Sequence, residues 1–331
     1  TGHVIVGVGA NLYVESGVEF RIADKDAFGL GEDRARVEIL VNGRAVIAGK
    51  SGAPVRFTPL NGAGARDHWA GIRFRKGGSG TSEVSWTEMF GCAGPAVLVD
   101  RIEANVHDLT VRYSEGGYRI EGVRLVPTLS DCSFTDIASA AVEVIGCRRF
   151  DMKNVTISSA RIGCRFLKDT NEDRITLKKC RIGAFETGIL ADFAGSVIAN
   201  TLIVTPTGTG VRYEDTSSSV NDLDHCTIDA DIGVAIASGL PRIESNIICS
   251  TAENGTAGIL YENTGNPLFH YNDIYGFDTA YQNCTQGLGA QARQPDFVGG
   301  NPYDYNLLPA SPLRHLDSNG LELGRYGPSY R

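Results

Sequence analysis

A short phrase recurs along the chain: a small residue, an apolar residue, a variable residue and a second apolar residue. Successive copies lie 21–25 residues apart. Alternation of apolar and variable positions buries one face of a strand, so each phrase predicts a short "anchor strand". Self-similarity at a near-constant period indicates a repeat architecture. The ten copies begin at Gly71, Ala96, Gly117, Ala141, Gly163, Gly188, Gly210, Gly233, Gly258 and Ala280.

A second alternating segment precedes each anchor phrase by about eight residues, as at 109–111, 155–157 and 202–204. No stretch long enough for a crossover helix separates the two. One coil of about 23 residues cannot bury its own apolar face, whereas stacked coils close a continuous core. Handedness rules favour a right-handed path. Polar residues suited to tight turns come just before several of the second segments: Asp108, Asp131, Asn154, Lys179 and Asn246.

The pattern therefore predicts an all-β fold, a right-handed parallel β-helix of ten or more coils. A β-sandwich is the alternative, but its hairpins require Asn-Gly or Asp-Gly turns, which are not a regular feature here. We expect a single domain over 1–331, with N-terminal coils and a cap in 1–60, regular coils in 61–285, and a C-terminal coil and cap in 286–331.

Composition fits this architecture. Glycine numbers 40 of 331 residues, and we attribute the excess to small residues that let the backbone corner sharply at each anchor. No apolar run approaches the ~20 residues of a membrane helix, so no membrane insertion is expected. A net charge of −8 argues against a nucleic-acid partner. The start at Thr1, without a leader, predicts a chain matured or trimmed at its front.

The repeats resemble those of bacterial secreted right-handed parallel β-helix proteins, the pectin-lyase-like superfamily. The resemblance spans nearly the whole chain. Beyond the anchor phrases it rests on residues 41–49, 54–58 and 69–74 at the front, and on 295–298, 304–307 and 323–327 in the tail. It implies a secreted or cell-envelope location and polysaccharide as substrate or ligand. If the protein is an enzyme, the resemblance implies a polysaccharide lyase or a glycoside hydrolase.

The motifs of the well-characterised branches are missing from the sequence. It contains no Arg-x-Pro-x-x-Arg of pectate lyases and no Asp-Pro-His-Asp of alginate epimerases. The Asn-Thr-Asp, Asp-Asp and Gly-His-Gly set of polygalacturonases is absent too. This absence favours binding over turnover and leaves enzymatic activity open.

Outward positions of the anchor strands are the candidate ligand contacts. Coils stack about 4.8 Å apart, so Arg119, Glu143 and Arg165 are expected to form a ladder of alternating charge with Glu121 beside it. Paired arginines could hold an acidic sugar, and Glu143 is a candidate general acid or base. The alternative is that these charges solvate the sheet and pair across strands, at ~0.2–1 kcal/mol each. The full predicted ligand-binding set is Arg119, Glu121, Glu143, Arg165, Asp192, Arg212 and Glu214.

Two further segments invite a chemical interpretation. Residues 214–225 carry carboxylates of the kind calcium prefers, without EF-hand spacing; an exposed turn is the alternative. His68 is either a proton carrier or part of a structural turn. The six histidines show no metal-ligand spacing with cysteine, so no metal and, calcium aside, no cofactor is expected.

The eight cysteines contain no Cys-x-x-Cys pair, which argues against zinc or haem attachment. Four of them occupy inward positions and are expected to act as small core hydrophobes: Cys132, Cys164, Cys180 and Cys226. Cys226 and Cys249 fall at similar phase in neighbouring coils, so a disulfide between them is a further hypothesis.

Two function classes follow. The first is an extracellular β-helix protein that binds, and in one version processes, polysaccharide on the outward face of the anchor-strand sheet, with a polysaccharide or cell-surface glycan as partner. The second is a non-catalytic surface, adhesin or scaffold module. The oligomeric state stays open.

Overall fold

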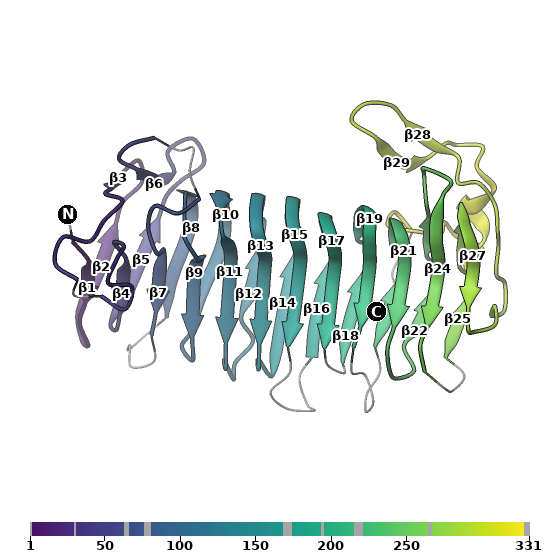
Figure 1. The fold of residues 1–331 in the computed structure, drawn as a ribbon, viewed down its shortest axis with the longest axis horizontal. Helices are drawn as coiled ribbons and strands as arrows, with labels where there is room; N and C mark the ends of the chain where they lie inside the picture. Colours follow the sequence, from purple (N-terminus) through teal and green to yellow (C-terminus); the bar gives the residue numbers. More distant parts are fainter. Residues whose placement is uncertain are drawn as a thin grey trace. The chain divides into compact units, whose positions relative to one another are not determined.

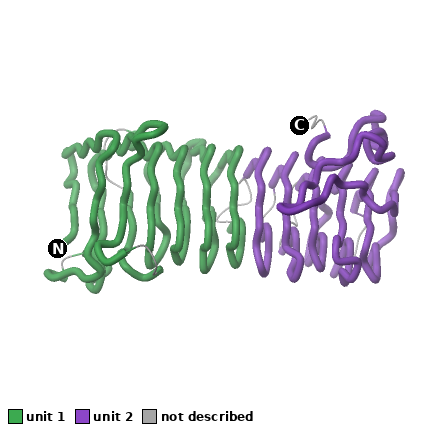
Figure 2. Tube along the Cα trace, turned by 90° about the horizontal axis from the view of Figure 1, so that it is seen from above, with its two compact units in different colours: residues 1–170 green, residues 171–331 purple. Residues whose placement is uncertain are grey.

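The computed structural model describes residues 2–29, 31–62, 66–75, 81–167, 174–192, 195–214, 221–263 and 267–327. It confirms the predicted right-handed parallel β-helix (Figure 1). The chain divides into two compact units, residues 1–170 and 171–331 (Figure 2). The single-domain organisation stays a prediction.

In the first unit the strands stack in three rows, which we call faces A, B and C. Face A holds the anchor strands, B follows A along the chain, and C follows B. Face A comprises β1 (Val4–Val6), β4 (Ile39–Val41), β7 (Ile72–Phe74), β9 (Pro95–Asp100), β11 (Gly116–Glu121) and the second halves of β13 (Ser133–Ile145) and β15 (Thr156–Leu167).

Faces B and C of this unit share two long strands. Face B comprises β2 (Asn11–Val14), β5 (Arg44–Ala48), the first halves of β8 (Ser82–Phe90) and β10 (Ala104–Ser114), β12 (Thr128–Ser130) and β14 (Arg149–Lys153). Face C comprises β3 (Glu19–Ile22), β6 (Val55–Pro59), the second halves of β8 and β10, and the first halves of β13 and β15.

The second unit repeats the same three rows. Face A comprises the second halves of β17 (Arg181–Asp192), β19 (Leu202–Tyr213) and β21 (Thr227–Ile236), with β24 (Gly255–Tyr261) and β27 (Phe277–Gln282). Face B comprises β16 (Arg174–Lys178), β18 (Ser196–Ala199), β20 (Asp222–Asp224), β22 (Arg242–Glu244) and β25 (Leu268–His270). Face C comprises the first halves of β17, β19 and β21, with β23 (Ile247–Cys249) and β26 (Asp273–Tyr275).

The tail of the second unit lies outside these rows. An antiparallel pair, β28 (Phe297–Gly299) and β29 (Asp304–Leu307), is followed by the short 3-10 helix η1 (Pro312–His315). Nowhere in the described ranges is a helix both long and apolar enough to cross a membrane.

From β8 onward, each described corner between faces B and C is made by one residue with a left-handed backbone, a conformation that Asn and Asp tolerate better than most residues. The predicted turn residues Asp108, Asp131, Asn154 and Lys179 all occupy it, with φ of 50–57°. The prediction was wrong for Asn246, because Ser245 forms that corner (φ 59°). Asn246 instead points inward, accepts the Cys226 N–H at 2.8 Å and donates to the carbonyl of Leu223 at 2.9 Å. Its buried amide is therefore satisfied by backbone.

Seven of the eight cysteines are buried, and Cys284 is partly exposed. Cys132, Cys164, Cys180 and Cys226 are buried as predicted, and burial raises the pKa of the Cys132 thiol to about 12. None of the eight cysteines forms a disulfide, so the disulfide hypothesis for Cys226 and Cys249 was wrong. The reason is register: this coil is only 20 residues long at face C, which places Cys249 opposite Asp229.

Close stacking, rather than cornering, explains the anchor glycines of the second unit. Gly188, Gly210, Gly233 and Gly258 form a column in which none has a left-handed φ. A Cβ added to Gly233 would lie 2.2 Å from Cγ2 of Ile248 and 2.5 Å from the carbonyl oxygen of Gly258. The next coil thus occupies the space that a side chain needs, and the expected corner role of these glycines was wrong.

We predict that Gly233→Ala lowers the free energy of unfolding by about 1–3 kcal/mol, because the added methyl overpacks a close backbone contact. Gly94→Ala is the matched control, since a Cβ there meets no atom within 4 Å. Urea unfolding measures both variants. Equal stability of the two would contradict the proposed role of the column.

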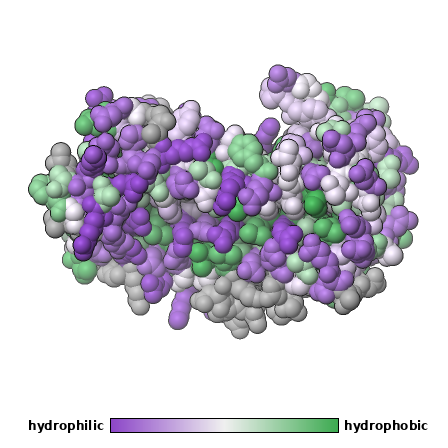
Figure 3. Space-filling view, in the orientation of Figure 1, coloured by the Kyte–Doolittle hydropathy of each residue, from purple (hydrophilic) through white to green (hydrophobic). Residues whose placement is uncertain are grey.

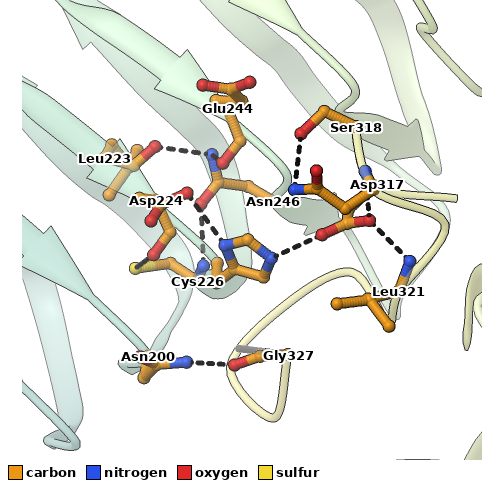
Figure 4. A network of polar contacts seen from close by, with 12 residues as sticks. Asn200, Leu223, Asp224, Cys226, Glu244, Asn246, Asp317, Ser318, Leu321 and Gly327 are labelled. Atoms are coloured by element: carbon orange, nitrogen blue, oxygen red, sulfur yellow. Dashed lines mark hydrogen bonds and ion pairs between the residues drawn. The ribbon is translucent and has the colours of Figure 1, made fainter. Parts of the chain in front are cut away.

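The tail segment 296–327 packs back across the B–C corners of the second unit. Leu307, Leu313 and Leu323 contact Ile247 and Cys249 in one apolar cluster. Polar contacts flank this cluster: the Tyr305 hydroxyl donates to Asp229 at 2.6 Å, and the side-chain amide of Asn200 donates to the carbonyl of Gly327. Buried His225 lies between Asp224 (2.8 Å) and Asp317 (3.4 Å) (Figure 4). The segment is therefore an integral part of this unit's packing.

Asp273 is a buried carboxyl at the start of β26. One oxygen accepts the Arg293 N–H at 2.8 Å, and burial raises the pKa of Asp273 to about 7. An unfolded Asp titrates near ~3.9. Between these values the folded protein binds more protons than the unfolded chain, so stability falls as the pH rises from about 4 to 7.

We predict that Asp273→Asn removes this fall in stability between pH 4 and 7. The variant is expected to be more stable than the wild type above pH 7 by about 1 kcal/mol or more, with little difference at pH 4. Thermal unfolding at several pH values tests this. Exposed Asp278, changed to Asn, is the control. A stability difference that stays constant across the pH range would contradict the assignment of this pH dependence to Asp273.

Candidate functional site

The predicted charge ladder exists on face A of the first unit. Strand register places Arg119 opposite Glu143, and Glu143 opposite Arg165, on β11, β13 and β15. Leu98 on β9 continues the row on the other side of Arg119. Because the side-chain period of a strand is two, all four residues point away from the core. Figure 3 shows hydrophilic side chains gathered over the N-terminal strands of this unit.

Glu143 joins the two arginines. Its Oε2 lies 3.1 Å from Nη1 of Arg119, and its Oε1 lies 3.1 Å from Nη1 of Arg165. Arg119 also pairs through Nε with Glu121. The Glu143 side chain is 13% exposed, against 37% for Arg119 and 42% for Arg165. The carboxylate therefore sits low between two exposed guanidiniums, and the four side chains together carry no net charge.

A small hollow of about 100 Å³ opens beside this row, where face C turns into face A. Arg119 and Glu143 line it together with Glu115 and Ser139. Sequence reasoning missed Glu115 and Ser139. Both lie two positions before the small residue of an anchor phrase, so comparing that position from coil to coil would have found them. Small residues keep the hollow open: Gly94, Pro95, Gly116, Gly117 and Ala140.

The remaining predicted residues belong to the second unit and form a different arrangement. Arg212 pairs through Nε with Glu214, and its Nη2 lies 3.7 Å from Glu262. The hydrogen bond to Glu214 raises the pKa of Arg212. The strand neighbours of Arg212 are Leu190 and Ala235, so no ladder forms around it. Asp192 lies half-buried at the end of β17.

The candidate calcium segment is only partly described, since residues 215–220 lie outside the described ranges. Asp222 and Asp224 within it are buried in β20, and Asp224 pairs with His225. Among the described residues, no group of three or more His, Cys, Asp or Glu side chains gathers as a metal site.

The segment around His68 favours the structural-turn interpretation. Trp69 is fully buried and donates from Nε1 to the carbonyl of Phe90 at 2.8 Å. The backbone N–H of His68 donates to the carbonyl of Gly91 at 3.0 Å. The turn is thus tied to the neighbouring coil through its backbone and through the indole.

We predict that Glu143→Gln destabilises the protein by about 0.5–1 kcal/mol, because two partly exposed ion pairs are lost and the two guanidiniums no longer share a carboxylate. Chemical denaturation at low and high salt tests this, since the difference shrinks as the charges are screened. Glu15→Gln, at an exposed carboxylate outside the row, is the control. A salt-independent effect would show that the pairing is not what Glu143 contributes.

Comparison with known proteins agrees with this fold. Residues 95–248 match the family model described as the right handed beta helix region. This match agrees with the right-handed parallel β-helix that the described strands form. No curated protein matches the chain.

Three solved structures are among those similar to this chain. The A-module of mannuronan C-5 epimerase AlgE6 from Azotobacter vinelandii is 14% identical, with 86% of this chain and 91% of that chain covered and a TM-score of 0.49. The Agl-KA catalytic domain is 14% identical, with 86% and 63% covered and a TM-score of 0.44. Pectate lyase Pel9A is 14% identical, with 99% and 88% covered and a TM-score of 0.28.

Proposed function

We propose that the protein binds polysaccharide on the outward side of face A in its first unit. The observation that carries this proposal is the row Arg119, Glu143 and Arg165, three aligned charged side chains on successive coils with both carboxylate oxygens paired. The row repeats at the coil spacing of about 4.8 Å. In an extended polysaccharide, successive sugar rings can contact successive side chains of this row.

The chemistry of the row suits hydroxyl groups. A guanidinium has five N–H donors, and the pairing with Glu143 uses one Nη of each arginine. A carboxylate accepts at about four lone-pair sites. Because Glu143 neutralises the arginines, the row attracts a polyanion less than two unpaired arginines would. We therefore propose a hydroxyl-rich, neutral or weakly charged polysaccharide.

Binding is the activity that this geometry supports. Both oxygens of Glu143 are engaged with guanidiniums, so its role in the proposal is to orient Arg119 and Arg165, not to transfer a proton. The hollow of about 100 Å³ is smaller than the ~300–1,000 Å³ of pockets that enclose small ligands. An open row beside a small hollow fits a chain bound along the surface. The resemblance of the repeats supports an extracellular or cell-envelope location.

The test is a binding screen over neutral and acidic polysaccharides, followed by affinity measurements on the best ligand. We expect Arg119→Ala with Arg165→Ala to weaken binding at least tenfold, because each arginine contributes charge-assisted hydrogen bonds of about 1.5–3 kcal/mol. Arg21→Ala on face C is the control, at an arginine that is 68% exposed. Arg212→Ala shows whether the second unit contributes.

Each outcome has a meaning. Unchanged affinity in the double variant would contradict the proposed face. Failure to bind any polysaccharide would favour the alternative, a non-catalytic surface or scaffold module whose charges only solvate the sheet. Release of reducing ends or unsaturated products from a bound polysaccharide would show processing as well as binding.

A further inference from the structure

A larger cavity lies on another part of the first unit, at the corner between faces B and C. Its volume is about 320 Å³, within the range of pockets that enclose a small ligand. It is separate from the hollow on face A, with which it shares no lining residue. Its walls come from the turn before β6, from β6 itself, and from β8, β10 and the corner before β13. Its charged and aromatic lining residues are Lys50, Arg56, Trp86, Glu88, Asp108 and Asp131.

Trp86 is the unusual residue of this cavity. It forms a B–C corner with a left-handed backbone (φ 44°), where the next three coils have Asp108, Asp131 and Asn154. Only small polar residues and glycine adopt this conformation readily. The indole is 39% exposed, whereas Trp69, the second tryptophan of the chain, is fully buried. An aromatic ring is thus held at the surface, at a position where backbone preference disfavours it.

Polar side chains line the cavity together with the indole. Asp108 and Asp131 form the next two corners, and each is oriented by a neighbour: Nδ1 of His107 lies 2.8 Å from Asp108, and the Asn154 amide donates to Asp131 at 3.0 Å. Arg56 donates from Nε to Glu88 at 2.8 Å. The cavity therefore combines one aromatic face with carboxylate acceptors and cationic donors.

The balance of charge narrows the ligand class. Lys50 and Arg56 are outnumbered by Glu88, Asp108 and Asp131, so the cavity carries one net negative charge and disfavours an anionic ligand. A pyranose ring offers an apolar C–H face for the indole and hydroxyls that donate to carboxylates and accept from cations. A cavity near the lower end of the ligand range holds one or two such rings.

We propose that this cavity is a second saccharide site, which binds a single neutral pyranose unit with its ring stacked on Trp86 and its hydroxyls on Asp108 and Asp131. This proposal does not depend on polysaccharide binding at face A, because the two sites share no lining residue. Its position on a different side of the coils lets it hold a chain end or a branch.

Tryptophan fluorescence provides a direct test, because Trp86 is exposed and Trp69 is buried. We titrate the full chain with methyl glycosides of glucose, galactose, mannose and N-acetylglucosamine. At least one of them is expected to change the emission in a saturable manner, with a Kd in the millimolar range, about −4 kcal/mol. Isothermal titration calorimetry of the same glycosides gives a signal that does not depend on the indole.

Three variants assign the site. Trp86→Asn restores the corner residue type of later coils, so the fold is expected to persist while calorimetric binding is lost. Asp108→Asn combined with Asp131→Asn keeps the indole and is expected to weaken binding about tenfold. Arg119→Ala with Arg165→Ala leaves monosaccharide binding unchanged, which separates this site from face A.

The proposal is overturned if none of the four glycosides binds at a concentration of about 100 mM, which is about 100-fold above an expected Kd of ~1 mM. It is equally overturned if Trp86→Asn binds as tightly as the wild type while circular dichroism confirms its fold. Loss of binding in the Arg119 and Arg165 variant alone would assign the sugar to face A instead.

Discussion

The parallel pairing of each strand with its counterpart one coil away is the constraint on which the rest of the structure depends. It imposes a constant step of about 4.8 Å, so any residue type repeated at the same place in the coil becomes a row. The rows differ in chemistry. Arg119, Glu143 and Arg165 form a charged row on face A, the anchor glycines of the second unit form a column of close contacts, and the B–C corners form a line of left-handed residues.

Alternation and period were enough to predict the β-helix, and to predict that Arg119, Glu143 and Arg165 align. In this part of the chain the anchor phrases are separated by the true coil length, so counting residues reproduces the register. The same counting failed for Cys226 and Cys249. There the coil is shortened at face C, and a shift of three residues moves a side chain to another position in the row.

Other features could not be predicted from the pattern because they depend on neighbours from different coils. Glu115 and Ser139 lie just before the anchor phrases, where apolar alternation gives no signal and only a coil-to-coil comparison of that one position singles them out. Trp86 gave no signal either, since a tryptophan is an unexpected residue at a left-handed corner. The glycine column shows the same limit: composition revealed an excess of glycine, but only the position of the next coil explains it.

The tail of the second unit changes how that unit must fold. In a solenoid, contacts are made between neighbouring coils, so folding can begin at any coil and spread along the stack. The hydrogen bond from Asn200 to Gly327 spans 127 residues, and that from Tyr305 to Asp229 spans 76. Contacts between residues this distant in sequence form late in folding, because the entropy of closing a long loop is lost before the contact contributes stability. The tail segment 296–327 therefore makes the coils it covers cooperative with one another, and this unit reaches its final stability only when that segment has docked.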